Sequence, residues 1–339
     1  MSKATLRRWI VGVTILVGLA SVSHGQKITS FDPPGSTGTY ARAINSEGQI
    51  AGYYTDAAGT HGFLRHKDGT FASFDPTGSH QTFPLAINSE GQITGFYNDA
   101  AGIAHGFLRQ RHGTITPFDP TDSHRYTIVQ DINSEGQIVG YYADAVTLRA
   151  HSFFRLANGT ITTFDVIGAV YTFAKAINSK GQIAGYTFDP AGTHGFLRQP
   201  DGTIASFDAP GPGFAQALNS RGQIAGYYSD AANHAHGYLR QPDGNITSFD
   251  PPGSNYTEVY AINSGGQITG FYFDSANVAH GFVRHEDGTI TSFDPPGSFG
   301  TAAYAINAEG QIAGYYVDAA SVAHGFLRHS CEVEDGSCE

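Results

Sequence analysis

Short runs of alternating apolar and polar residues, broken by glycine-containing turns, recur along the chain at a nearly constant spacing. The clearest run reads Ala-Ile-Asn-Ser-Glu-Gly-Gln-Ile-Ala-Gly-Tyr-Tyr over residues 43–54. Its isoleucine, Ile44, has equivalents at Ile87, Ile132, Ile177, Leu218, Ile262 and Ile306, so the steps are 43, 45, 45, 41, 44 and 44 residues. A period of this length predicts a repeat architecture in which each copy is one supersecondary unit.

Each copy contains four short segments with the pattern of a β-strand. The first ends in Ala-Ile-Asn, the second reads Gln-Ile-Ala-Gly-Tyr-Tyr, the third His-Gly-Phe-Leu-Arg and the fourth Thr-Ile-Thr-Ser-Phe-Asp. Asn-Ser-Glu-Gly and Asp-Gly connections predict tight hairpin turns, because glycine adopts the positive φ that these turns need. Four antiparallel strands per copy are typical of a β-propeller blade. We therefore predict an all-β, seven-bladed β-propeller over residues 26–329, with an open solenoid as the alternative.

The two ends of the repeat array favour the closed ring. A Phe-Asp pair, Phe31 and Asp32, precedes the first complete copy, and the seventh copy stops after Arg328 without a fourth strand of its own. Seven complete blades result only if residues 27–32 supply the outer strand of the last one. A solenoid would instead need a capping repeat at each end. We therefore expect the N-terminal strand to close the propeller.

Composition and charge narrow the class of protein further. The chain of 339 residues holds 43 glycines and 41 Phe plus Tyr, and only 49 residues carry a formal charge. Long charged helices, coiled coils and disordered polyelectrolytes do not fit this composition.

The N-terminal residues have the features of a secretory signal. Lys3, Arg7 and Arg8 precede an apolar run over residues 9–20, and small residues follow at 23–25. Because a membrane span needs roughly 20 apolar residues, we predict a cleaved signal peptide over residues 1–25, with an uncleaved anchor as the alternative. The protein is then secreted or periplasmic and carries a net charge of -14. Such an acidic chain is a poor partner for nucleic acid.

The two cysteines, Cys331 and Cys338, lie in the C-terminal tail of residues 330–339. In an exported protein a close pair of this kind predicts a disulfide bond. The spacing matches neither a metal site nor a redox motif.

At the segments containing His61-Gly62-Phe63 and their equivalents, the chain resembles the HAF family of extracellular repeat proteins, with Gly or Ser in place of the family's Ala. The resemblance implies export and a repeated β fold, and it brings no catalytic residues. The turns at residues 200–204 and 242–246 also resemble outer-strand turns of virginiamycin B lyase type propellers.

Residues present in every copy are expected to build blades. Each repeated histidine follows an aspartate by five to seven residues, as His61 follows Asp56, and a second carboxylate, Asp75, falls near it across the predicted hairpin. We expect these groups to fix the loops by hydrogen bonds. A metal site is not expected, because it needs three or more convergent ligands. The glycine inside the second strand, Gly52, is expected to leave room for aromatic rings of an adjacent blade.

One inner-strand position varies while most of its neighbours stay small. Two residues before the repeated isoleucine the copies carry Arg42, Leu85, Gln130, Lys175, Gln216, Tyr260 and Tyr304. We place this set near the channel mouth on the face of the longer, more variable loops, where binding usually resides. Loop residues His80, His124 and Arg125 are further candidates on that face. The predicted ligand of this monomeric, cofactor-free module is an extracellular glycan, such as an acidic polysaccharide, or a protein.

Two alternatives to a binding module stay open. No G-x-S-x-G, H-E-x-x-H or phosphate-binding glycine motif is present in the sequence. A polysaccharide lyase would use Arg42 or Lys175 to offset the uronate charge, and Tyr260, Tyr304, His80 or His124 to move protons. A structural role at the cell surface, in which the ring of side chains only fills the channel, is the second alternative.

Overall fold

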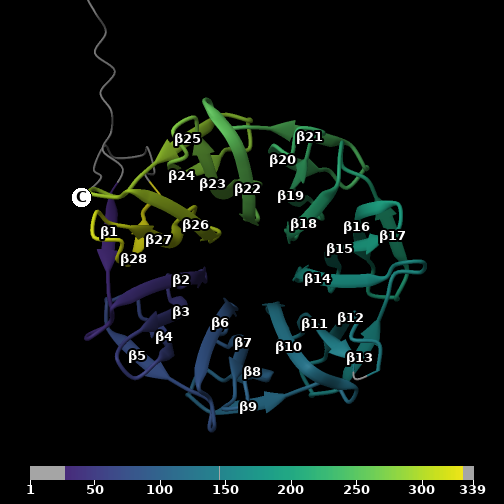
Figure 1. The fold of residues 1–339 in the computed structure, drawn as a ribbon, viewed down its shortest axis with the longest axis horizontal. Coiled ribbons are helices and arrows are strands. Elements are labelled where there is room, and N and C mark those ends of the chain that lie inside the picture. The colour runs from purple at the N-terminus through teal and green to yellow at the C-terminus, as the bar shows by residue number, and fades with distance from the viewer. Residues whose placement is uncertain (1–26, 145, 331–339) are drawn as a thin grey trace, which may run out of the picture.

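Seven four-stranded antiparallel blades surround a central axis in the computed structural model, which describes residues 27–144 and 146–330 (Figure 1). The predicted signal peptide, Cys331 and Cys338 lie outside these residues. Within them are 28 strands. The first three blades are β2 (Gly38–Ile44), β3 (Ile50–Thr55), β4 (Thr60–Arg65) and β5 (Phe71–Phe74); β6 (Gln81–Ile87), β7 (Ile93–Asn98), β8 (Ala104–Arg109) and β9 (Ile115–Phe118); and β10 (Ser123–Ile132), β11 (Ile138–Asp144), β12 (Ala150–Arg155) and β13 (Ile161–Phe164).

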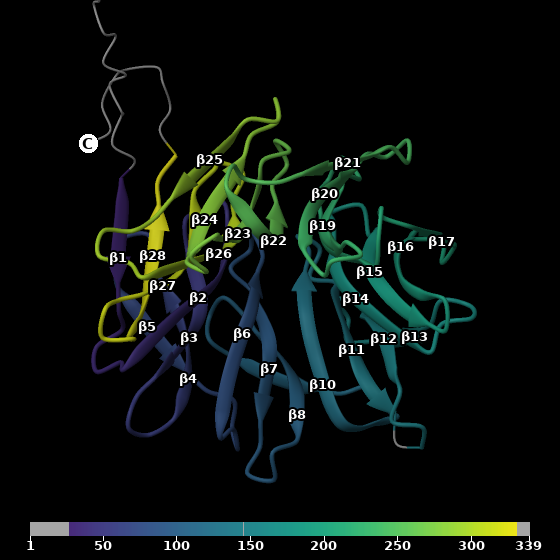
Figure 2. The same ribbon diagram turned by 45° about the horizontal axis from the view of Figure 1, so that its top comes forward.

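The remaining four blades repeat this plan. They are β14 (Tyr171–Ile177), β15 (Ile183–Asp189), β16 (Gly192–Arg198) and β17 (Ile204–Phe207); β18 (Gly213–Leu218), β19 (Ile224–Ser229), β20 (Ala235–Arg240) and β21 (Ile246–Phe249); β22 (Ser254–Ile262), β23 (Ile268–Asp274), β24 (Ala279–Arg284) and β25 (Ile290–Phe293); and β26 (Gly300–Ile306), β27 (Ile312–Val317), β28 (Ala323–Arg328) and β1 (Ile28–Phe31). Figure 1 and Figure 2 show the long inner strands, such as β6 and β10, inclined so that their C-terminal ends point toward the central channel.

The N-terminal strand completes the last blade, as predicted. β1 pairs antiparallel with β28, with Ile28 opposite Arg328 and Phe31 opposite Gly325. Phe31 is buried, and its ring packs edge-on against Phe63 of the first blade at a centroid distance of 6.3 Å. The N-terminal strand therefore joins the last blade to the first and removes the exposed edge of β28.

A closed circle of asparagine hydrogen bonds joins the inner ends of all seven blades. Asn45 Nδ2 donates to the backbone oxygen of Asn88 at 3.2 Å, and the same bond runs from blade to blade until Asn307 Nδ2 donates to the Asn45 oxygen at 3.1 Å. The members are Asn45, Asn88, Asn133, Asn178, Asn219, Asn263 and Asn307. All are buried. The sequence predicted only a turn at this asparagine, and its hydrogen bonds between blades were not predicted.

Aromatic and aliphatic side chains fill the spaces between neighbouring blades. Phe74 of β5 packs on Phe107 of the second blade, with centroids 6.1 Å apart. The repeated arginine at the end of each third strand covers such a ring: the Arg65 guanidinium carbon lies 4.9 Å from the Phe31 centroid. Its Nη1 also donates to the His66 carbonyl. The hydrophobic core is thus divided into inter-blade layers.

Each repeated histidine lies between two carboxylates, which agrees with the expected structural role. His61 Nδ1 is 2.7 Å from Asp75 Oδ2, and His61 Nε2 is 3.3 Å from Asp56 Oδ1. The same arrangement occurs at His105, His151, His194, His236, His280 and His324. In the last blade the second carboxylate is Asp32, supplied by the N-terminal segment.

No helix long and apolar enough to cross a membrane occurs among the residues that the structure describes.

Truncating Phe31 should open the ring. Phe31→Ala removes the ring that fills the space between the first and last blades, and we expect it to lower the free energy of unfolding by about 3–5 kcal/mol. Urea unfolding measures this change. Ser30→Ala, at an exposed position of the same strand, is the control, and equal stability of the two variants would contradict closure by this strand.

Breaking the asparagine circle should destabilise the whole ring. Asn178→Ala removes the 3.0 Å bond to the buried Asn219 carbonyl and the two bonds that its own Oδ1 accepts from the Lys180 and Gln182 amides, so the free energy of unfolding should fall by about 1–3 kcal/mol. Thermal and urea unfolding of this variant and of the exposed neighbour variant Ser179→Ala give the comparison. A loss no larger than that of the control would argue against the circle.

The seven histidine sites predict a dependence of stability on pH. The hydrogen bond with Asp75 raises the pKa of His61, and equivalent bonds with Asp208 and Asp250 raise the pKa of His194 and His236. When folding raises the pKa of a histidine, protonation stabilises the folded protein. This stabilisation is fully present below the pKa of the unfolded state, about 6.5, and is lost as the pH rises through the pKa of the folded state.

The melting temperature should therefore fall as the pH rises from about 6 through the raised folded-state pKa values. His61→Gln should flatten this slope, whereas His80→Gln, at an exposed position, should leave it unchanged. Scanning calorimetry across this range makes the test, and identical slopes for wild type and His61→Gln would refute it.

Candidate functional site

The variable inner-strand position is a β-bulge in every blade. On β2, Ala41 pairs with Gly52 and Ala43 with Ala51, so Arg42 is the extra residue between them. The same shift in register leaves Leu85, Gln130, Lys175, Gln216, Tyr260 and Tyr304 unpaired. A bulge redirects the side chain of its extra residue. All seven side chains line one pocket on the axis.

The glycine inside each second strand is explained by this bulge. A Cβ on Gly52 would lie 2.2 Å from the backbone oxygen of Tyr40 and 2.9 Å from Cα of Ala41, both on the inner strand of the same blade. The prediction that Gly52 makes room for aromatic rings of an adjacent blade was therefore wrong: the nearest atoms belong to the backbone of the inner strand of its own blade. Only glycine permits the close backbone approach that the bulge imposes.

The pocket occupies the part of the channel nearest to the asparagine circle. It has a volume of about 270 Å³ and is lined by the bulge residues and by residues one and two positions after them, such as Ala43 and Ile44. No residue before the bulge takes part in its lining. Asn45 begins the short turn between the first two strands of its blade. The bulge residues therefore lie nearer to the short turns than to the long loops. The predicted place of the bulge residues on the loop face was wrong. The chain enters each inner strand from the loop face, and Arg42 lies near the opposite, C-terminal end of its strand.

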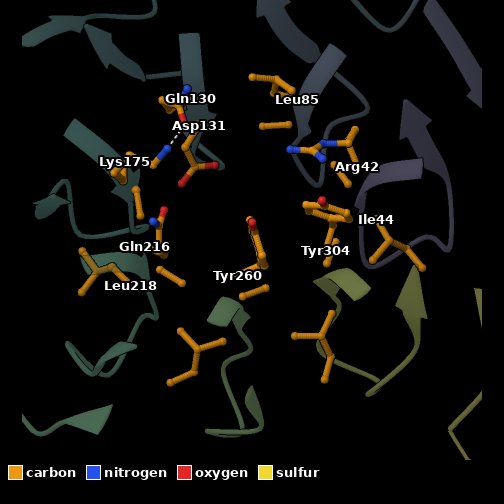
Figure 3. A pocket seen from close by; sticks show the side chains of 18 of the residues that line it. Arg42, Ile44, Leu85, Gln130, Asp131, Lys175, Gln216, Leu218, Tyr260 and Tyr304 are labelled. Carbon is orange, nitrogen blue, oxygen red and sulfur yellow. Dashed lines mark hydrogen bonds between the residues drawn. The ribbon is translucent and has the colours of Figure 1, made fainter. Parts of the chain in front are cut away.

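Two cations enter the pocket from opposite sides, as Figure 3 shows for Arg42 and Lys175. The Arg42 guanidinium carbon lies 3.8 Å from the Tyr304 ring centroid. Lys175 Nζ donates to Gln130 Oε1 at 2.5 Å. Burial in the channel, together with the charge of Arg42, lowers the pKa of Lys175 to about 8. In the described part of the chain neither cation forms an ion pair with a carboxylate.

The two tyrosines of the ring lie in contact with each other. Their ring centroids are 4.5 Å apart. The Tyr260 hydroxyl donates to Glu258 Oε2 at 2.6 Å, while Tyr256 donates to the other oxygen of the same carboxylate at 2.7 Å. Burial, reinforced by Tyr304 and Glu258, raises the pKa of Tyr260. Tyr260 is therefore a phenol that keeps its proton.

Asp131 is a pocket residue that the sequence analysis missed. It stands where the other six copies have alanine, as at Ala43 and Ala176, and it lines the pocket beside Lys175 and Gln130 (Figure 3). Its Oδ1 accepts from the Ile132 amide at 2.8 Å, and its Oδ2 accepts from the Ile177 amide at 2.9 Å. Burial raises its pKa to about 7. The signal in the sequence was a single acid in an otherwise uniform alanine position.

The predicted loop residues do not belong to this pocket. His80, His124 and Arg125 are exposed and are absent from its lining. The structure thus brings together Arg42, Gln130, Lys175, Gln216, Tyr260 and Tyr304 and leaves the other three residues apart from them. The prediction that His124 and Arg125 lie in a loop was wrong, because both belong to β10. Among the described residues no group of three or more His, Cys, Asp or Glu could hold a metal ion.

Comparison with known proteins supports the fold class. The chain is similar to the solved structure of a streptogramin B lyase, with a TM-score of 0.59 and 15% identity over 90% of this chain and 98% of that one. It is also similar to virginiamycin B lyase from Staphylococcus aureus, with a TM-score of 0.58 and 12% identity over 90% of this chain and 100% of that one. A third similar structure is BP39L lectin from Burkholderia pseudomallei, with a TM-score of 0.56 and 12% identity over 88% of this chain and 97% of that one.

These similarities define the protein as a β-propeller of a fold shared by lyases and lectins. At this level of identity they show the fold alone. No family model and no curated protein matches the chain, so the resemblance to HAF repeats stays a prediction.

Proposed function

We propose that this protein is an exported binding module whose axial pocket holds a carboxylate-bearing ligand, with the end of an acidic polysaccharide chain as its main candidate. The observation that carries the proposal is that Arg42 and Lys175 face one cavity and find no acid partner among the described residues. Two cations in a confined pocket of an acidic protein stabilise an anion by charge-assisted hydrogen bonds.

The other pocket groups suit a sugar. Gln130 and Gln216 offer amides that donate and accept, Tyr304 offers a phenol, and Leu218 and its aliphatic equivalents offer apolar surface. A cavity of about 270 Å³ is slightly smaller than most small-molecule pockets, which span about 300–1,000 Å³. The pocket therefore suits the terminal residue of a chain entering along the axis rather than a chain lying across the propeller.

Binding is better supported than polysaccharide lyase activity. His80 and His124, two of the four candidate proton carriers, lie outside the pocket. Tyr260 is held as a protonated donor to Glu258. Only Tyr304 remains beside Arg42 in the pocket, whereas all the groups needed to bind an anionic sugar are present.

Removing either cation should weaken binding of a uronic acid oligomer. Isothermal titration with oligogalacturonate should give binding that Arg42→Ala and Lys175→Ala each weaken by at least about tenfold, the loss expected for one charge-assisted hydrogen bond. The matched control is Lys180→Ala, because Lys180 is exposed and outside the axial pocket. A neutral galactose oligomer of the same length should not bind.

Unchanged melting temperatures establish that the variants fold. Binding by the wild type that both alanine variants retain would place the site elsewhere and overturn the proposal. A rise in absorbance from unsaturated uronate would favour the lyase alternative. Absence of both binding and absorbance would favour a structural role.

A further inference from the structure

The third blade differs from the other six in carrying Asp131 in place of alanine, and this gives one side of the axial pocket a carboxylate. Asp131 is the one carboxylate among the lining residues, and it lies on β10, next to the blade that carries Lys175. Arg42 lies on β2, across the channel (Figure 3). The pocket thus has a purely cationic side at Arg42 and a mixed side formed by Lys175, Gln130 and Asp131.

Charge arithmetic then limits the ligand. Arg42, Lys175 and Asp131 are the charged residues in the lining, so the pocket carries a net charge of about +1 when all three are ionised. A single carboxylate neutralises this charge. A second negative group would have to lie on the mixed side, near the Asp131 carboxylate, where like charges repel by several kcal/mol in a partly buried site.

Asp131 also keeps acceptor capacity for a neutral ligand group. Each of its oxygens accepts one backbone amide, from Ile132 and Ile177, and a carboxylate has about four acceptor positions. A sugar hydroxyl can donate to the free positions while Lys175 donates to a neighbouring oxygen. The mixed side is therefore suited to hydroxyl groups and the Arg42 side to the carboxylate.

We propose that Asp131 makes the axial pocket selective for a sugar-acid residue that carries a single carboxylate and excludes a residue that carries two. This inference rests on the proposed function and names the substrate class of the same site. Asp131 is a specificity-determining residue in this account. The competing explanation is that its carboxylate only joins the third and fourth blades through the Ile177 amide.

A pair of open-chain sugar acids tests the proposal, because gluconate and glucarate share one carbon skeleton and differ by one carboxylate. Titrations are made at several pH values from about 6 to 9, because burial raises the pKa of Asp131 and lowers that of Lys175, and the comparison is taken at the pH of strongest gluconate binding. The wild type should bind gluconate at least about tenfold more tightly than glucarate. Asp131→Asn, which keeps the shape, and Asp131→Ala, which restores the residue of the other six blades, should both bring the ratio close to one.

The outcomes separate the alternatives. If Asp131 is purely structural, its replacement would lower the melting temperature and leave the ratio of the gluconate and glucarate affinities unchanged. That result would overturn the inference. Gluconate binding by the wild type would still support the pocket as the binding site. Equal binding of the two acids by the wild type, or binding of neither, would also overturn it. The oligogalacturonate titration decides the proposed function independently.

Discussion

The circle of seven asparagine side chains is the constraint on which the rest of the molecule depends. Each amide holds its own turn through a hydrogen bond, as Asn45 does with Gln49, and donates to the next blade. Each of these carbonyls also accepts the amide of its own turn glycine, as Asn45 does from Gly48, so the inter-blade bonds complete the hydrogen bonding of buried groups and contribute about 0.5–1.5 kcal/mol each. The circle therefore sets the distance between inner strands, and with it the width of the axial channel.

The β-bulge connects this scaffold to the candidate function. The inner strand of each blade pairs with the second strand on both sides of the bulge, and the residue that the bulge leaves unpaired turns into the channel. Substitution of that residue does not disturb the pairing, so the seven copies can differ there, from Arg42 to Tyr304, while the blades stay alike. Asp131 is a different case, because its carboxylate accepts two backbone amides and so takes part in both the scaffold and the pocket.

Sequence reasoning found the ring of variable residues and misjudged its surroundings. The residue types of Arg42 and Lys175 showed that the position is not core. The sequence did not show that it is a bulge, because a bulge is defined by the register between two strands. Asp131 was missed for a related reason: a single acid in an alanine position has no meaning until the structure shows that the position lines a cavity. His80 lies in a loop, whereas His124 and Arg125 lie at the start of β10, and only the fold shows that none of the three lines the pocket.

By itself the sequence determined the number of blades, their four strands, the tight turns and closure by residues 27–32, since these follow from local alternation, glycine at the turns and the offset of the two ends. The tertiary structure alone decided which end of the channel holds the pocket and which side chains meet there. Arg42 and Lys175 are brought across one cavity from separate blades, and the asparagine bonds join residues at least 41 positions apart. Contacts of this kind depend on how blades are placed around the axis, and no local pattern records that placement.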